Sequence, residues 1–174
     1  MGTPIFNIPS VGGRTRPRAS HSHGARAGRR QTDEGFLCKH CHNYVCSAAA
    51  LSGVQNRNHC PYCLWSRHLD LIEAGDRLSA CKALMRPIGL TFKATNKRYG
   101  PGRGELMLIH LCIECEGLSI NRIAADDDPQ DVFAVFEISS RLDMPSLAVR
   151  GILPLTAGDS ELVRAQLFGA RIGG

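Results

Sequence analysis

Eight cysteines carry the clearest chemistry in this sequence, and six of them form three Cys-x-x-Cys pairs. A two-residue gap in a tight turn directs both sulfurs at one point, which is what tetrahedral zinc requires. Eighteen residues separate the first pair from the second, a spacing typical of one zinc site built from two pairs. The sequence therefore predicts a zinc site made by Cys38, Cys41, Cys60 and Cys63.

The third pair, Cys112 and Cys115, needs two further ligands to complete a second site. Cys81 is the expected third ligand, because a thiolate is a soft donor and a cysteine in a small metal-binding domain usually binds the metal. For the fourth ligand we favour His68 over His110 and Cys46, with Asp70 as a carboxylate that would orient the imidazole. We therefore predict two zinc ions per chain.

Two enzymatic hypotheses compete with structural zinc. Cys60-Pro61-Tyr62-Cys63 matches the active-site tetrapeptide of glutaredoxins, but that fold needs a βαβ unit directly before the motif. Here the 59 preceding residues are rich in Arg and Gly and hold another cysteine pair. The second hypothesis is a zinc enzyme with an open coordination position and His59 or His110 as general base. Gly-x-Ser-x-Gly, Walker and His-Glu-x-x-His patterns are absent from the sequence.

The positive charge is concentrated at the N-terminus. Residues 1–32 contain six arginines and no acid, whereas the rest of the chain holds 15 basic and 16 acidic residues. A segment so poor in large apolar side chains is expected to be disordered and to attract phosphate backbones. Arg57, Asn58 and His59 are further candidate contacts, although ordering of the neighbouring turn explains Asn58 and His59 better. The predicted nucleic-acid contacts are Arg14, Arg16, Arg18, Arg26, Arg29, Arg30 and Arg57.

Strand and helix patterns surround the cysteines. Residues 87–93, 105–111 and 118–123 read as strands of an antiparallel meander. Asp128-Pro129 begins a helix, and Asp159 is expected to cap a second helix over 160–171. Asp126–Asp128 could hold a divalent cation, but helix capping is the interpretation we favour.

These patterns predict a small α+β protein with a zinc-ribbon-like antiparallel body. We expect a disordered basic arm at 1–34, a zinc-binding domain at 35–128 and a helical extension at 129–174. The apolar runs are too short to span a bilayer, and the N-terminus lacks a secretory signal. We therefore expect a cytoplasmic protein, with no membrane association, whose cysteines stay reduced.

Arg57-Asn58-His59-Cys60-Pro61 is the run that gives the RNHCP domain family its name, and the chain resembles that family over about residues 36–128. Further matching blocks are 62–70, 75–77, 84–89, 109–115 and 121–124. The resemblance implies a bacterial zinc-ribbon-like protein without an established activity. It includes every cysteine except Cys46 among the motif positions, and both His68 and His110 lie in matching blocks.

The favoured functional hypothesis is a zinc-binding module with structural zinc that associates with nucleic acid, RNA rather than DNA, or with the ribosome. The alternatives are a zinc-dependent or thiol-redox enzyme and a protein-interaction adaptor. An adaptor would use the apolar segment 152–155 and the final helix as a docking surface, although packing onto the body explains that segment better.

Overall fold

The structure is a computed structural model that describes residues 35–94, 104–142, 147–148 and 150–169. The chain divides into two compact units, Met1–Gln31 and Thr32–Gly174, and every described residue belongs to the second. The predicted disordered arm lies outside the described residues, as do its six arginines.

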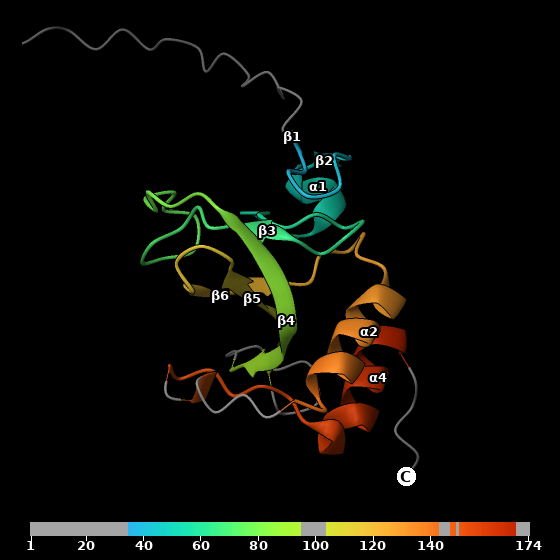
Figure 1. Cartoon of the computed structure of the whole chain (residues 1–174). Helices are drawn as coiled ribbons and strands as arrows, with labels where there is room; N and C mark the ends of the chain where they lie inside the picture. The colour runs from blue at the N-terminus through green and yellow to red at the C-terminus, as the bar shows by residue number, and fades with distance from the viewer. Residues whose placement is uncertain (1–34, 95–103, 143–146, 149, 170–174) are drawn as a thin grey trace, which may run out of the picture. The chain divides into compact units, whose positions relative to one another are not determined.

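Four antiparallel strands form the main sheet in chain order (Figure 1). Strand β3 (Ser66–Arg67) is short, and β4 (Leu84–Lys93), β5 (Glu105–Cys112) and β6 (Leu118–Arg122) form the predicted meander. The predicted small α+β class is confirmed. Strand β4 begins three residues before the predicted start and contains a register shift between Pro87 and Gly89. Proline has no N–H for the ladder, which confines it to such irregular positions.

A second, two-stranded sheet precedes the main one in the chain. Strand β1 (Gly35–Leu37) pairs antiparallel with β2 (Tyr44–Cys46), and the turn between them holds the first cysteine pair. The one-turn helix α1 (Ala49–Ser52) follows and ends at Gly53. This hairpin therefore presents Cys38 and Cys41 together from one turn.

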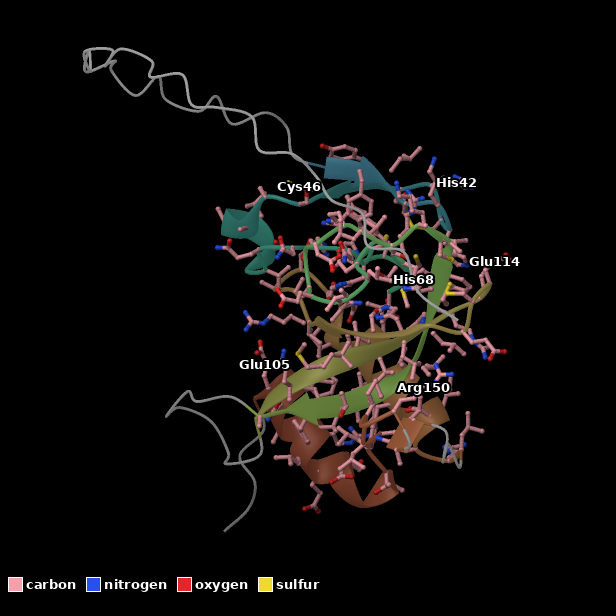
Figure 2. The ribbon with its side chains drawn as sticks, turned by 90° about the vertical axis from the view of Figure 1, so that its left-hand side faces the viewer. His42, Cys46, His68, Glu105, Glu114 and Arg150 are labelled. Atoms are coloured by element: carbon pink, nitrogen blue, oxygen red, sulfur yellow. The ribbon has the colours of Figure 1, made fainter. Side chains whose placement is uncertain are left out.

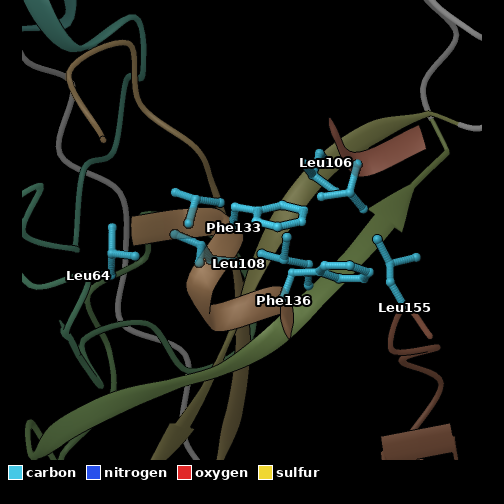
Figure 3. Packing of buried hydrophobic residues seen from close by; sticks show 9 residues of the cluster. Leu64, Leu106, Leu108, Phe133, Phe136 and Leu155 are labelled. Atoms are coloured by element: carbon cyan, nitrogen blue, oxygen red, sulfur yellow. The ribbon is translucent and has the colours of Figure 1, made fainter. Parts of the chain in front are cut away.

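Helix α2 (Pro129–Ser139) supplies much of the hydrophobic core. Its N-cap is Asp128, whose carboxylate accepts a hydrogen bond from the amide of Gln130, as the capping interpretation predicts. Its buried face includes Phe133 and Phe136, which pack against Leu106 and Leu108 of β5 (Figure 3). Leu64, Leu90, Val132, Leu155 and Val163 complete this cluster.

Helix α4 (Ser160–Phe168) follows a 3-10 turn, η1 (Ala157–Asp159), and ends at Gly169. The Asp159 carboxylate accepts hydrogen bonds from the amide and hydroxyl of Thr156, so its side chain serves the capping box of η1 rather than the start of α4. Positions 170 and 171 of the predicted helix lie outside the described residues.

The segment before η1 packs against β4. The amide of Leu155 donates to the carbonyl of Leu90, and the hydroxyl of Thr91 donates to the carbonyl of Leu153. Leu155 is buried in the core, which fits packing onto the body rather than an open docking surface. Among the described residues, no helix has the length and apolar character needed to cross a membrane.

Candidate metal centres

The three Cys-x-x-Cys pairs are built on one backbone pattern. In each, the amide of the first cysteine donates to the carbonyl five residues later, across 2.8–2.9 Å. This bond closes the chain into a narrow turn and directs the two sulfurs to the same side. The three bonds join Cys38 to Asn43, Cys60 to Trp65 and Cys112 to Gly117.

The residue after each second cysteine has a left-handed backbone. His42, Leu64 and Glu116 have φ values of 60°, 59° and 56°. This conformation costs a non-glycine residue roughly 1–2 kcal/mol, so it persists only where the surroundings impose it. The same costly conformation occurs in all three turns. We infer that it is imposed by the need to bring the two sulfurs of each pair together.

The first centre contains four sulfurs from two of these turns. Cys38 Sγ lies 3.7 Å from Cys63 Sγ, and Cys41 Sγ lies 3.6 Å from Cys60 Sγ. All four sulfurs lie within 4.8 Å of one another. A zinc ion with Zn–S distances of about 2.3 Å sets the edges of an S4 tetrahedron at about 3.8 Å, so the cluster fits the ion.

The second centre joins the ends of three strands. His68 follows β3, Cys81 precedes β4, Cys112 ends β5, and Cys115 lies in the turn between β5 and β6. Cys81 Sγ lies 3.7 Å from Cys112 Sγ, and His68 Nδ1 lies 3.1 Å from Cys115 Sγ. Three thiolates and one imidazole are an established donor set for structural zinc.

The predicted fourth ligand, His68, is therefore the histidine that the fold brings to the third pair. Figure 2 shows His68 near the turn that carries Glu114, with Cys46 apart from it on the β1–β2 hairpin. Gly117 makes room for the imidazole, because a Cβ atom at this position would lie 2.7 Å from His68 Cε1. The Asp70 carboxylate does not orient this ring, contrary to our expectation. It accepts hydrogen bonds from the Asn58 side chain and the Gly75 amide, each at 2.9 Å.

Each centre contains one acidic cysteine. A backbone hydrogen bond from Asn43 lowers the pKa of Cys41 to about 6. Burial raises the pKa of Cys112, but backbone hydrogen bonds from Cys115 and Glu114 outweigh it and lower the value to about 6. Burial raises the pKa of Cys60 to about 11. Because metals bind thiolates, Cys41 and Cys112 would supply ionised ligands at neutral pH, and Cys60 would lose its proton when an ion binds.

His110, the rival candidate ligand, is fully buried away from both clusters. Its Nε2 donates to the carbonyl of Leu64 at 2.7 Å, and its Nδ1 accepts from the Asn121 amide at 2.9 Å. Burial, together with the nearby His59, lowers the pKa of His110 to about 3. Both ring nitrogens are occupied in the neutral form, so His110 serves as neither metal ligand nor general base.

Arg57 and His59 are anchored by the acidic pair that follows β6. Arg57 Nη1 lies 2.7 Å from Asp126, its Nη2 lies 3.3 Å from Asp127, and its side chain is 0% exposed. His59 Nε2 lies 2.7 Å from Asp127, also in the interior. This burial does not fit the predicted contact between Arg57 and nucleic acid, nor a general base at His59. The acidic pair binds the Arg57 guanidinium and the His59 imidazole instead of a divalent cation.

Sequence reasoning missed the loop that connects His68 to Cys81. Asp76 accepts hydrogen bonds from the amides of Leu71, Ile72, Glu73 and Leu78, and these bonds hold its pKa well below the ordinary value. The Asn58 side chain donates to Asp70 and accepts from Arg77. The available signal was the turn composition of Gly75-Asp76-Arg77, which lies inside a motif block.

Comparison with known proteins gives a family match and no match to an individual protein. Searches of curated proteins and of solved structures found no match to the chain. The RNHCP domain family matches residues 33–133, which include all eight cysteines, both four-residue clusters and the acidic pair that holds Arg57. The match covers more than half of the sequence, and the chain therefore belongs to the RNHCP domain family.

Proposed function

We propose that this protein is a cytoplasmic zinc-binding module with two structural zinc ions per chain, and that it associates with nucleic acid or with the ribosome. The observation that carries the proposal is the number of donors. Each cluster offers four protein ligands, which fill a tetrahedral ion and leave no position for the water that a catalytic zinc activates.

Zinc is the metal that suits both clusters. A four-thiolate site accepts zinc or iron, but a site with three thiolates and one imidazole is characteristic of structural zinc. The ion would also replace hydrophobic core that the small β1–β2 hairpin lacks. Around the first centre, the buried cluster consists of Cys38, Val45 and Cys60, with Phe36 packed against it.

The burial of Cys60 argues against the thiol-redox hypothesis. A glutaredoxin nucleophile must reach a disulfide in solution with an ionised sulfur, whereas Cys60 is 0% exposed and burial raises its pKa. The zinc-enzyme hypothesis lacks a general base, since both candidate histidines are buried in hydrogen-bonded networks.

The arginines of residues 14–30 support association with nucleic acid. Six positive charges without a neighbouring acid would displace counterions from phosphates, a source of affinity that is independent of nucleotide sequence and weakens with salt. RNA is our proposed partner, free or within the ribosome.

Metal analysis and crosslinking test the two halves of the proposal. Protein purified without chelator should contain two zinc ions per chain, and the Cys46→Ser control should contain the same. A ratio of one or below, or iron in place of zinc, would contradict the metal assignment.

Crosslinking in cells, followed by sequencing of bound nucleic acid, should recover RNA. Deletion of residues 1–34 should flatten the salt dependence of RNA binding in vitro. An unchanged salt slope after the deletion would contradict the role of residues 1–34 in RNA binding. Failure to recover any nucleic acid would contradict the proposed association with RNA.

A further inference from the structure

An arginine-lined pocket of about 440 Å³ lies beside the first metal centre. The β1–β2 hairpin forms one wall, and residues from the turns around 55–58, 67–69 and 77 form the others. Three arginines line it, and no Asp or Glu is among its described lining residues: Gly35, Phe36, Leu37, Ser47, Gln55, Arg57, Asn58, Arg67, Leu69 and Arg77.

The three arginines differ in how far their charges are already neutralised. Arg57 is paired with Asp126 and Asp127, so it contributes shape and no net charge. Arg77 Nε lies 3.8 Å from Asp70, and its side chain is 43% exposed. This charge is only partly compensated, because exposed ion pairs at that distance are weak.

Arg67 is the least compensated of the three. Its Nε and Nη2 donate to the carbonyl of Lys82 at 3.2 and 2.9 Å, and a carbonyl carries no net charge. Within the described part of the chain, no carboxylate forms an ion pair with Arg67. The backbone contact fixes the guanidinium while its positive charge remains available to an anion.

The other walls suit a nucleobase. Phe36 places an aromatic ring at the pocket and also packs against the buried cluster of Cys38, Val45 and Cys60, which limits its movement. Ser47 and Gln55 add a hydroxyl and an amide. Aromatic rings and guanidinium groups are the surfaces on which unpaired bases stack, and polar side chains read base edges and the 2′-hydroxyl.

We infer that this pocket binds one nucleotide of single-stranded RNA, with a backbone phosphate on Arg67 and Arg77 and the base against Phe36. The inference rests on the proposed association with nucleic acid and deepens it. A pocket of this size and concave form accepts one extruded nucleotide and excludes a duplex. Gly35, which lines the pocket, directly follows the arginine-rich segment 1–34 in the sequence.

Fluorescence anisotropy with zinc-loaded full-length protein and a fluorescein-labelled ten-nucleotide uridine RNA tests the pocket. Arg67→Gln should weaken binding about threefold to tenfold and reduce the salt slope by about one. Phe36→Leu, which keeps an apolar side chain but removes the ring, should weaken binding about tenfold with the salt slope unchanged. Arg141→Gln, an exposed arginine outside the pocket, should bind like wild type.

Metal content, measured for every variant, ensures that the comparison is made between zinc-loaded proteins. Titration of wild type with uridine 5′-monophosphate should shift the NMR signals of the Gln55 side-chain amide. If wild type binds the RNA and both Arg67→Gln and Phe36→Leu bind it with the same affinity, the pocket is not the nucleotide site. The proposed function would then still stand. Absence of RNA binding by wild type would overturn both. Equal or tighter binding of the matching thymidine DNA would overturn the assignment to RNA.

Discussion

The two candidate metal centres use the same turn but differ in how deeply their cysteines are buried. The first places two such turns face to face, and its Cys38 and Cys60 are 3% and 0% exposed. The second uses one turn and two single ligands, and both Cys81 and Cys115 are exposed. Donor geometry alone therefore does not set how accessible a centre is, because the packing around the sulfurs differs.

Sequence separation differs as well. Cys38 and Cys63 lie 25 positions apart in the first centre, whereas His68 and Cys115 lie 47 positions apart in the second. Closing the longer chain segment of the second centre costs little additional entropy. The second centre can form, however, only after β3, β4 and β5 have paired in register. We expect the first centre to organise its own hairpin and the second to depend on the assembled sheet.

The largest expected effect comes from Cys60→Ser compared with Cys115→Ser. Structural zinc contributes roughly 10–16 kcal/mol to folding, which is comparable to the stability of a whole domain. Cys60→Ser should lose the first ion and collapse amide dispersion in residues 35–65, because Cys60 also belongs to the buried cluster. Cys115→Ser should lose one ion and keep the signals of helix α2.

Zinc analysis and amide NMR spectra measure both outcomes, with Cys46→Ser as the matched control because Cys46 belongs to neither cluster. An equal loss of amide dispersion in the Cys60 and Cys115 variants would show that the two centres contribute equally to the fold.

Asp127→Ala should weaken the ionic network that holds Arg57 and His59 next to Cys60 of the first centre. The carboxylate binds Arg57, His59 and the amide of Ala124, all in the interior. The variant leaves the buried His59 ring and the Ala124 amide without their acceptor, and Arg57 paired with Asp126 alone. This should cost about 3–5 kcal/mol in the free energy of unfolding, measured by denaturant titration of zinc-loaded protein.

Asp131→Asn, on the exposed side of helix α2, should change the free energy of unfolding by less than about 0.5 kcal/mol. A loss below about 1 kcal/mol in Asp127→Ala would mean that the ionic network does not support the first centre.

The same contrast explains which parts of the molecule the sequence could predict. The Cys-x-x-Cys spacing and the strand patterns are local signals, and they located both clusters and the meander. The network of Arg57, His59 and Asp127 was not found, because its members lie about 70 positions apart and no local periodicity joins them. Arg57 was instead predicted as a nucleic-acid contact, a role that requires an exposed side chain.

His68 could be predicted only in part from the sequence. Its position after Cys63 indicated a possible ligand, but only the register of β3, β4 and β5 shows that it meets Cys115. Asp70, two residues later, was predicted to orient His68. It belongs instead to the loop between His68 and Cys81, where amide donors compete for its carboxylate.

Release of metal should proceed faster from the second centre than from the first, by about tenfold or more. Exposed sulfurs are open to competing ligands and to alkylating agents, whereas buried ones require local unfolding first. Limited chelator with simultaneous alkylation, followed by mass spectrometry, should label Cys81 and Cys115 before Cys38 and Cys60. Simultaneous labelling of all four cysteines would show that the two centres open together.

The smallest effect is expected from Asp76→Asn, which loosens the loop between two ligands of the second centre. Asp76 accepts four backbone amides in an exposed loop, and an asparagine keeps only one acceptor oxygen. Amide exchange at Leu71, Ile72 and Leu78 should accelerate, and the second ion should be released a few-fold faster. The first centre, which does not use this loop, should be unaffected.

The pH dependence of this effect follows from the lowered pKa of Asp76. A carboxylate with a depressed folded-state pKa stabilises the loop at every pH above its ordinary unfolded value of about 3.9, and the contribution is lost only as the pH falls through the folded pKa. The difference in amide exchange between wild type and Asp76→Asn, after correction for the intrinsic exchange rate, should therefore stay constant from pH 8 to pH 5. A difference that already shrinks between pH 7 and pH 5 would contradict the role of the ionised carboxylate, as would faster metal release from the first centre.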